Sequence, residues 1–312
     1  MNHTKTMLHP AFKKERTLVE EYLSTLVSGE RKLLNLPNNL AEAMNYSLLA
    51  GGKRLRPVLV MLCARIASEN EEQTTQKALP PAAALEMIHC FSLIHDDLPA
   101  MDDDDLRRGK PTNHKKYSEA MAILAGDGLA TLPYLVITKS NALSVKQKAI
   151  LSEQLAEATM QMIAGQVYDT MGGFDKNTSP EQDLELTHRN KTGALIRAAC
   201  RLGVMAANHN NEINVDTLLT PLTQYGETIG LMFQIVDDVL DVTQTTEQLG
   251  KAANKDADAG KLTYPTIFGL EQSQQFINEY AQKANALLDT LNKGKAVEPL
   301  RNLVSYLSTR TK

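Results

Sequence analysis

Tryptophan is absent from this sequence, and aromatic residues make up only 5% of its 312 residues. Cysteine is also rare, with three widely separated residues and no CxxC pair, so neither a zinc site nor a disulfide framework is indicated. All three lie in apolar stretches, and we expect buried free thiols in a reducing cytoplasm. They are Cys63, Cys90 and Cys200.

Long apolar runs and an excess of basic charge are missing as well. No apolar run approaches the ~20 residues needed to cross a bilayer, and residues 1–23 lack the apolar core of a signal peptide. Lysine and arginine number 33 and aspartate and glutamate 37, which gives a formal net charge of −4. We therefore expect no membrane span and no nucleic-acid partner.

Apolar residues recur with a helical period along almost the whole chain, beginning with Leu18, Tyr22 and Leu26 on one face. No alternating run is long and β-branched enough to predict a strand, and no linker rich in proline, glycine or serine divides the chain. The sequence therefore predicts an all-α protein with a single domain over residues 1–312. The later helices are expected at about 38–50, 57–68, 80–97, 115–140, 146–171, 182–208, 216–243, 264–292 and 297–309.

Two of these expected helices contain glycines in their interior. Gly193 and Gly203 lie in one, and Gly226 and Gly230 lie in the next. Each glycine costs about 1 kcal/mol relative to alanine, so each needs a reason. Close packing of helices and room for a ligand beside the backbone both explain them, and the sequence leaves both explanations open.

Two clusters of aspartates end strongly apolar stretches. The first reads HDDLPAMDDDD over residues 95–105, and the second reads QIVDDVLD over residues 234–241. Such runs often form a solvated face. Here, however, adjacent carboxylates flanked by isoleucine, valine and phenylalanine repel one another and lose hydration, which is unfavourable unless a cation neutralises them.

The spacing within each cluster groups its carboxylates. Asp237, Asp238 and Asp241 share one helical face, and the bend at Pro99 brings Asp102 back toward the first pair of aspartates. Oxygen ligands without histidine or cysteine suit Mg²⁺, which completes its shell with water and phosphate oxygens. The sequence therefore predicts two acidic walls that face each other across a cavity and hold a diphosphate through magnesium.

Basic residues near these clusters supply the positive charge that a diphosphate also needs. Each has an ordinary explanation, such as a basic helix end, local charge balance or a core histidine, but together they indicate a second anion site. They are Lys53, Arg54 and Arg56 in a glycine-opened loop, His89 two turns before the first cluster, Arg107 and Arg108 after it, Lys191 in an apolar stretch, and Lys251 and Lys261 after the second cluster.

These segments together resemble a known family. In order along the chain, they are GGKRLRP, SLIHDDLPAMDDDDLRRGKPTNH, GQVYD, KTGALI, FQIVDDVLDV and LGK…GKLTYP. They resemble the trans-isoprenyl diphosphate synthases, and most closely the bacterial farnesyl diphosphate synthases, or geranyltranstransferases. The resemblance implies an isoprenoid synthase-like helical bundle around a deep central cavity, a homodimer, and three Mg²⁺ ions with substrate bound.

The resemblance also implies a role for each matching residue. The implied metal ligands are Asp96, Asp97, Asp102, Asp237, Asp238 and Asp241. The implied contacts of the allylic diphosphate or its cation are Arg107, Lys191, Thr192, Gln234, Lys251 and Lys261. The implied isopentenyl diphosphate site is Lys53, Arg56, His89 and Arg108. The residues expected to be catalytic are Asp96, Asp102, Asp237, Lys191, Thr192 and Gln234, and the C-terminal Arg310 resembles part of a tail that closes over the site.

The expected reaction is the condensation of dimethylallyl or geranyl diphosphate with isopentenyl diphosphate to farnesyl diphosphate. The allylic diphosphate ionises, the isopentenyl double bond attacks the cation, and a proton is lost. By resemblance, Phe91 with Ser92 would form the cavity floor and stop the chain at fifteen carbons. The alternative is that Phe91 is simply a core residue.

Other functions remain open at the sequence level. A geranylgeranyl or longer-chain synthase differs only in product length, and the bulk of Phe91 disfavours it. A class I terpene cyclase needs one diphosphate site and usually an aromatic-lined cavity, which the low aromatic content disfavours. A non-catalytic partner subunit typically lacks the aspartates, and both clusters are present here.

Overall fold

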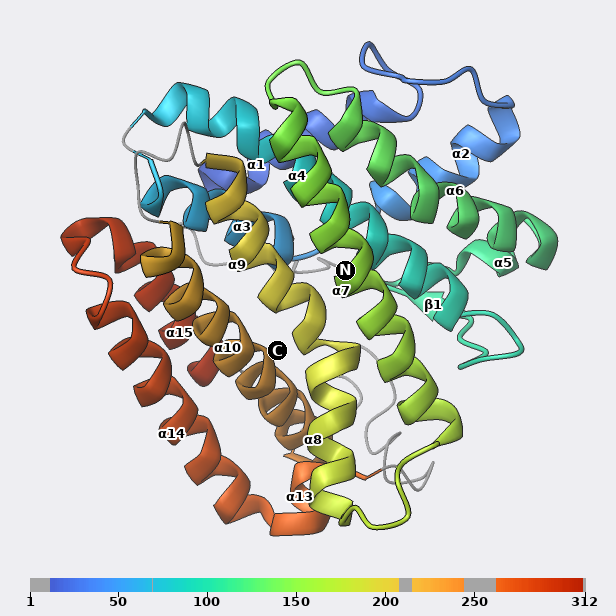
Figure 1. Cartoon of the computed structure of the whole chain (residues 1–312). Coiled ribbons are helices and arrows are strands. Elements are labelled where there is room, and N and C mark those ends of the chain that lie inside the picture. Colours follow the sequence, from blue (N-terminus) through green and yellow to red (C-terminus); the bar gives the residue numbers. More distant parts are fainter. Residues whose placement is uncertain (1–11, 69, 208–214, 244–261, 311–312) are drawn as a thin grey trace, which may run out of the picture. The chain divides into compact units, whose positions relative to one another are not determined.

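The computed structural model describes residues 12–68, 70–207, 215–243 and 262–310 (Figure 1). These residues belong to two compact units, which are considered separately. Unit 1 comprises Met1–Leu155 and Leu202–Ile213, and unit 2 comprises Ala156–Arg201 and Asn214–Lys312. The single domain and the central cavity expected from the sequence therefore stay predictions.

Unit 1 is organised around one long buried helix. Helix α4 packs most extensively against α6 and α3, and most of its residues from Ala78 to Ile94 are buried. The elements of this unit are α1 (Lys13–Leu26), α2 (Asn38–Leu48), α3 (Leu55–Ile66), α4 (Glu71–Asp96), β1 (Leu106–Arg107), β2 (Lys110–Pro111), α5 (Asn113–Lys116), α6 (Glu119–Thr138) and parts of α7 (Val145–Met171) and α9 (Gly193–Ala207).

The start of α4 differs from the prediction that this helix begins at about residue 80. It begins at Glu71, because the Asn70 side chain accepts a hydrogen bond from the backbone N–H of Gln73 at 3.1 Å and caps the first turn. Pro80 and Pro81 lie inside the helix. A proline removes one helical hydrogen bond, so burial of the surrounding face must offset that loss.

Helix α6 corrects a second expectation. The sequence analysis expected no apolar run long enough to cross a bilayer. Helix α6 is nevertheless long and apolar enough to do so, judged by length and composition alone. In the structure 44% of this span is buried, and the helix packs against α4 and α2. Such packing is typical of the core helix of a globular unit.

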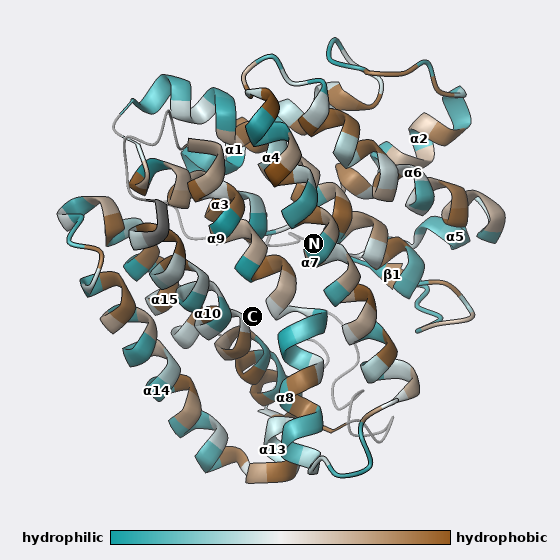
Figure 2. Cartoon of the chain, viewed as in Figure 1, coloured by the Kyte–Doolittle hydropathy of each residue, from teal (hydrophilic) through white to brown (hydrophobic). Residues whose placement is uncertain are grey.

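Unit 2 is organised around α10 (Val215–Thr243), which packs against α14 (Leu270–Asp289) and α15 (Glu298–Thr309). Polar and apolar residues alternate along α14, as expected for a helix with one buried face (Figure 2). The Tyr225 hydroxyl inside α10 donates a hydrogen bond to the Leu300 carbonyl at 2.9 Å. The other elements are α8 (Pro180–Lys191), α13 (Tyr264–Phe268), η2 (Gly294–Val297) and the remaining parts of α7 and α9.

Three helices that the sequence predicted as continuous are divided. The helix expected over 115–140 is interrupted at Tyr117 and Ser118, between α5 and α6. The helix expected over 182–208 ends as α8 at Lys191 and restarts as α9 at Gly193. The helix expected over 264–292 breaks at Gly269, whose φ of 80° is incompatible with a continuing helix. The all-α prediction is nevertheless confirmed, since the strands in the described residues are limited to the two-residue pair β1 and β2.

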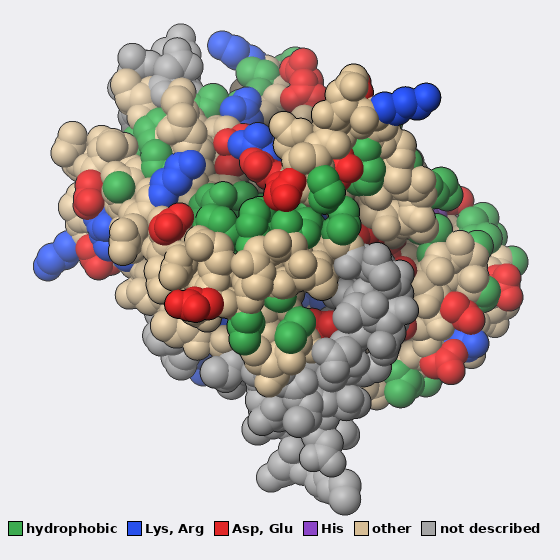
Figure 3. Space-filling view, turned by 90° about the horizontal axis from the view of Figure 1, so that it is seen from below, with side chains coloured by type: hydrophobic (Ala, Val, Ile, Leu, Met, Phe, Trp, Pro, Cys, Tyr) green, Lys and Arg blue, Asp and Glu red, His purple; other side chains and the backbone are tan. Residues whose placement is uncertain are grey.

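The described surface in Figure 3 shows acidic and basic side chains interspersed among uncharged atoms. No basic patch dominates the described part of this face. The three cysteines are buried thiols, as the sequence predicted.

The interior glycines allow close packing of helices. A Cβ atom on Gly203 would lie 2.3 Å from the Val60 carbonyl oxygen, and one on Gly226 would lie 2.9 Å from the Arg197 Cα atom. A Cβ atom on Gly230 would lie 3.1 Å from the Cα atom of Gly193. Of the two explanations that the sequence left open, the structure supports helix packing at these positions.

We expect Gly203→Ala to lower the free energy of unfolding by about 1–3 kcal/mol, because the added methyl group meets rigid backbone. Gly128→Ala is the matched control, since its Cβ would first meet the flexible Met44 side chain, with Sδ at 3.0 Å. Alanine also favours the helix there by ~1 kcal/mol. Urea denaturation of both variants checks this, and equal losses of stability would contradict the packing explanation.

Candidate active site

The turn after α4 brings the first cluster of aspartates together. Asp96 is the last residue of α4, and its carbonyl oxygen accepts a hydrogen bond from the Asp102 N–H at 2.8 Å. The turn is closed by Asp103, which has a positive φ of 47° and whose N–H donates to the Leu98 carbonyl at 3.2 Å. The structure thus confirms that the chain returns to place Asp102 beside Asp96.

Asp97 differs from its neighbours because it is buried and paired with arginine. The Nε atom of Arg107 donates to both carboxylate oxygens of Asp97, at 2.7 and 2.9 Å. Burial raises the pKa of Asp97, and the arginine opposes that rise. Arg107, expected at the allylic diphosphate, and Asp97, expected at the metal, therefore form an ion pair with each other.

Arg107 and its neighbour Arg108 lie on a tight hairpin. Strands β1 and β2 are joined by Arg108 and Gly109, with φ values of 55° and 73°, as in a type I′ turn. The Arg108 guanidinium donates a hydrogen bond to the Gly51 carbonyl. The φ of Gly52 is 124°, which favours glycine, and a Cβ atom there would also lie 2.8 Å from that guanidinium.

His89 lies among these arginines. Burial, followed by the charges of Arg56 and Arg108 and then of Arg107 and Arg54, holds the pKa of His89 well below its usual value. The sequence grouped His89 with the lysines and arginines of the second anion site, and that grouping stays a prediction. A neutral imidazole supplies a hydrogen bond to an anion instead of a charge.

A cavity in unit 1 collects several of these groups. Two of the four residues expected to bind isopentenyl diphosphate, His89 and Arg108, line it, and Lys53 and Arg56 are half-buried nearby in sequence. The full lining is Tyr46, Ser47, Ala50, Arg54, Glu86, His89, Cys90, Leu93, Ile94, Asp97, Arg107, Arg108, Lys110, Pro111, Thr112 and Asn113.

The residues expected to form the cavity floor lie one turn before Asp96. Phe91 is 8% exposed, and its ring meets the His95 ring edge-on at a centroid distance of 5.6 Å. The Ser92 hydroxyl donates to the His89 carbonyl at 2.9 Å. The structure therefore places Phe91 in the core of unit 1, where both of its possible roles remain open.

In unit 2, the first aspartate of the second cluster is paired with the C-terminal segment. The Arg310 guanidinium forms an ion pair with Asp237 and donates to the Phe233 carbonyl at 3.0 Å. Arg310 is also 4.1 Å from the centre of the Phe233 ring. Its side chain is 3% exposed, whereas that of Asp237 is 43% exposed. A protein cation thus occupies one side of a carboxylate expected to bind metal.

The other two aspartates of this cluster are buried. Asp238 accepts a hydrogen bond from the Tyr264 N–H at 3.0 Å, and its carboxylate lies 3.6 Å from His188 Nε2. The Oδ1 atom of Asp241 is buried without a hydrogen-bond partner in the described residues. An orphaned buried carboxylate oxygen is costly and suits a cation. The Asp238 carboxylate, in contrast, already has partners within the protein, namely Tyr264 and His188.

Lys191 has the partner that its apolar surroundings require. Its Nζ atom lies 2.6 Å from Asp169 Oδ2, where Asp169 belongs to the GQVYD segment on α7. Thr192 forms the junction between α8 and α9, and its N–H donates to the His188 carbonyl at 3.3 Å. A Cβ on Gly165 would lie 2.0 Å from the Lys191 nitrogen, so glycine lets α7 approach this junction.

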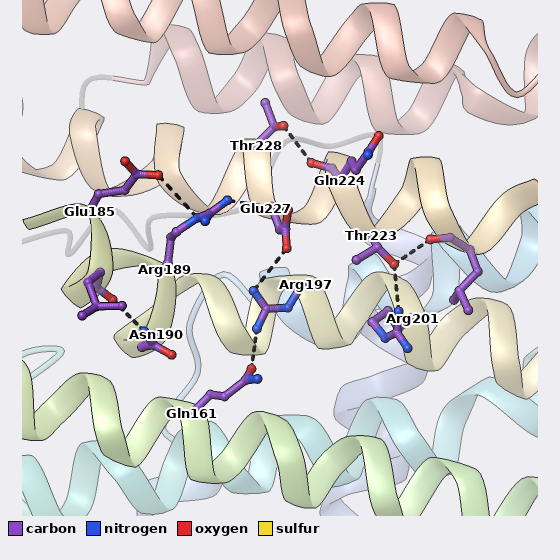
Figure 4. Close-up of polar contacts among 12 residues, drawn as sticks. Gln161, Glu185, Arg189, Asn190, Arg197, Arg201, Thr223, Gln224, Glu227 and Thr228 are labelled. Atoms are coloured by element: carbon purple, nitrogen blue, oxygen red, sulfur yellow. Dashed lines mark hydrogen bonds and ion pairs between the residues drawn. The ribbon is translucent and has the colours of Figure 1, made fainter. Parts of the chain in front are cut away.

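Figure 4 shows the polar contacts that fix α9 in unit 2. Arg197 lies between Glu227 of α10 and Gln161 of α7, with Nη1 3.5 Å from Glu227 Oε1 and Nη2 donating to Gln161. Arg201 donates to the Thr223 hydroxyl at 3.2 Å. These contacts hold the helices that carry Thr192 and the half-buried Gln234.

The donor set of the candidate metal site is made of oxygen atoms. No group of three or more potential ligands is assembled within the described residues. A magnesium ion, however, needs few protein ligands when a diphosphate completes its shell. Asp96 and Asp102 in unit 1 and Asp237 and Asp241 in unit 2 therefore fit magnesium chemically. Lys251 and Lys261 lie outside the described residues.

Sequence reasoning missed two members of the candidate site. It gave Asp169 no role, although the aspartate follows a recognisable segment and partners Lys191. It also did not pair Arg310 with Asp237. Partners this far apart in sequence leave no local pattern, so only the position of Asp169 in GQVYD was a usable signal.

Comparisons with known proteins agree on one family. A family model described as polyprenyl synthetase matches residues 37–299. Geranylgeranyl pyrophosphate synthase 7 of Arabidopsis thaliana, a chloroplastic protein, is 43% identical over 295 residues, which are 94% of this chain and 81% of that protein.

Solved structures of bacterial proteins are similar over nearly the whole chain. A geranyltransferase from Legionella pneumophila has a TM-score of 0.80 and 34% identity, with 96% of each chain covered. A geranyltransferase from Helicobacter pylori, complexed with magnesium and isoprenyl diphosphate, has a TM-score of 0.73 and 30% identity, with 97% of this chain and 96% of that chain covered.

We expect Arg310→Ala to strengthen divalent-metal binding at the second aspartate cluster. Removing the competing guanidinium frees Asp237, and because a partly exposed ion pair is worth about 1 kcal/mol, the gain is roughly fivefold in Kd. Mn²⁺ binding to substrate-free protein, followed by electron paramagnetic resonance, measures it. Arg301→Ala is the control, since Arg301 pairs with Asp289 away from the cluster. Unchanged or weaker binding in Arg310→Ala would contradict the competition.

Proposed function

The chain belongs to the polyprenyl synthetase family, and from that membership we propose that it elongates an allylic diphosphate with isopentenyl diphosphate. Prenyl transfer is the reaction class of this family, the trans-isoprenyl diphosphate synthases that the motifs indicated. One observation on this chain itself supports the proposal. The turn that pairs Asp96 with Asp102 lies directly before the hairpin whose arginines line the cavity with His89.

Unit 1 contains carboxylates, which would bind a diphosphate through a metal ion, and arginines, which would bind a second diphosphate directly. The Asp96 and Asp102 carboxylates would hold Mg²⁺, which neutralises an allylic diphosphate and makes it a better leaving group. The arginine-rich loop and hairpin would bind the other diphosphate directly, through the fork of Arg108 and the point charge of Lys53. In our proposal Asp237 and Asp241 of unit 2 would also hold magnesium. The number of ions stays a prediction.

The protein's own groups then stabilise the charge that develops on the allylic carbon. The Thr192 hydroxyl and the Gln234 amide present oxygen atoms that stabilise a cation without attacking it. Lys191, Lys251 and Lys261 would hold the departing diphosphate. Lys53, Arg56, His89 and Arg108 would orient the isopentenyl diphosphate so that its double bond faces the cation. A proton from the new chain would pass to the released diphosphate.

Two products are candidates for the reaction of this chain, geranylgeranyl diphosphate and farnesyl diphosphate. The names of the curated relatives favour geranylgeranyl diphosphate, with identities of 42–44% to the plant synthases. They support this product better than the farnesyl diphosphate expected from the sequence. A specific observation favours farnesyl diphosphate as the second candidate, namely the bulky Phe91 in the core below Asp96. The name geranyltransferase of two structural neighbours is consistent with it.

The remaining expectations from the resemblance stay proposals. We propose a homodimer located in the cytoplasm, with dimethylallyl or geranyl diphosphate as the starter. A class I terpene cyclase, which needs one diphosphate site, is disfavoured by the separate group of arginines around His89. Purified protein incubated with Mg²⁺, isopentenyl diphosphate and each allylic starter would reveal the reaction by formation of a longer prenyl diphosphate.

Substitution of either leading aspartate should abolish most of the activity. We expect Asp96→Ala and Asp237→Ala each to lower kcat about 10²–10³-fold, the size of effect seen when one transition-state contact is lost. Asp105→Ala is the matched control, because Asp105 pairs with Lys115 at 2.8 Å and its side chain is 74% exposed. Steady-state assays with geranyl diphosphate measure all three variants. Near-normal turnover in either of the first two would remove that residue from the proposed metal site.

The product length tests the role of Phe91. We expect Phe91→Ala to shift the products to longer chains by at least one five-carbon unit, because a smaller side chain deepens the cavity floor. Leu85→Ala is the control, a fully buried residue of the same helix. Chromatography of the dephosphorylated products gives the lengths. If wild type makes twenty carbons and Phe91→Ala makes the same, Phe91 is a core residue and the farnesyl candidate fails.

A further inference from the structure

The glycine-opened loop before α3 holds three basic residues, and the structure separates one from the other two. Lys53 and Arg56 are half-buried, whereas Arg54 is only 4% exposed. Arg54 precedes the first residue of α3, and its φ of 54° is left-handed. A residue with a Cβ atom rarely adopts this conformation unless its surroundings enforce it.

The Arg54 guanidinium has buried partners on two other helices. Nη1 donates to Glu86 Oε1 on α4 at 2.7 Å, and Nη2 donates to the Leu48 carbonyl at the end of α2, also at 2.7 Å. Nε lies 3.7 Å from Glu20 on α1. The side chains of Arg54 and Glu86 are 2% and 4% exposed. Water therefore competes little for this pair, and it fixes the loop to α4.

The loop is held at its other end by Arg108. The guanidinium of Arg108 donates to Gly51 and lies against Gly52, whose φ values are 86° and 124°. Gly51, Gly52 and Arg54 all have positive φ. The contacts of Arg108 hold the beginning of this segment, and the contacts of Arg54 hold its end. The shape of the loop follows from those contacts, because glycine-rich backbone by itself has no preferred conformation of this kind.

Glu86 also connects the loop to the rest of the cavity. It lies three residues before His89 on α4, so both side chains belong to the same side of that helix. Both line the cavity, as do Arg54 and Arg108. A single carboxylate therefore sets the position of the loop relative to the helix that carries His89.

We propose that the buried Arg54–Glu86 ion pair is a positioning pair, which sets the affinity for isopentenyl diphosphate without touching it. The pair fixes the loop from which Lys53 and Arg56 extend, and it commits the Arg54 guanidinium to Glu86 at the wall of the cavity. This inference rests on the proposed function of that site. It assigns Arg54 to the scaffold, although its sequence position suggests another phosphate ligand.

Glu86→Gln tests the pair with almost no change of shape. We expect KM for isopentenyl diphosphate to rise about tenfold, since one misplaced cation is worth roughly that factor. KM for geranyl diphosphate should change less than about twofold. A role confined to stability would lower Tm and leave both KM values unchanged, and equal rises in both KM values would also overturn the proposal.

Glu15→Gln is the matched control, because Glu15 is a buried glutamate of the same unit that pairs with Arg65 away from the loop. It should lower Tm in the same way without changing either KM. Arg54→Lys keeps the charge but loses the two-pronged contact, and we expect an intermediate KM for isopentenyl diphosphate. It also provides the test should Glu86→Gln fail to fold, and an unchanged KM in Arg54→Lys would then overturn the proposal.

The wild-type assay separates the two levels of inference. Wild-type protein that forms no prenyl product from any allylic starter would remove the proposed function. Active wild-type protein with an unchanged KM for isopentenyl diphosphate in Glu86→Gln would remove only the positioning role.

Discussion

The candidate site of this protein depends on the repulsion between like charges that are partly buried and close together. Carboxylates crowd the ends of α4 and α10, and arginines crowd the loop and hairpin beside α4. These charges have internal partners, such as Arg107 for Asp97 and Arg310 for Asp237. In our proposal, binding of metal and diphosphate would be an exchange of partners, because the incoming charges would replace or share these ion pairs.

The same constraint explains where the backbone is strained. Four described residues other than glycine have positive φ, and three of them, Arg54, Asp103 and Arg108, flank the cavity of unit 1. Left-handed conformations of such residues persist only where the surroundings enforce them. For Arg54 and Arg108 the residue's own side chain makes the hydrogen bonds that hold the loop, and for Asp103 the backbone N–H donates to the Leu98 carbonyl at 3.2 Å. The groups that give the site its charge therefore also give its loops their shape.

Product length depends on far fewer residues than the fold does. Identity of 43% to a geranylgeranyl synthase reflects the shared motifs and helices along the whole chain. In our proposal, one bulky side chain at the cavity floor would reverse the outcome without changing that identity measurably. This is why the relatives and Phe91 favour different products, and why likeness over the whole chain supports the reaction class more firmly than the product.

The sequence by itself determined the helical class, the two aspartate clusters, the return of Asp102 to Asp96 and the buried thiols, because each follows from spacing along one segment. The tertiary structure decided the break at Thr192, the lowered pKa of His89 and the inward turn of Asp238. It also decided that Arg54 serves the scaffold while its neighbours remain half-buried. The physical reason is that burial and ion pairing depend on partners far away in the sequence, whereas helical periodicity and chain bends depend on neighbours.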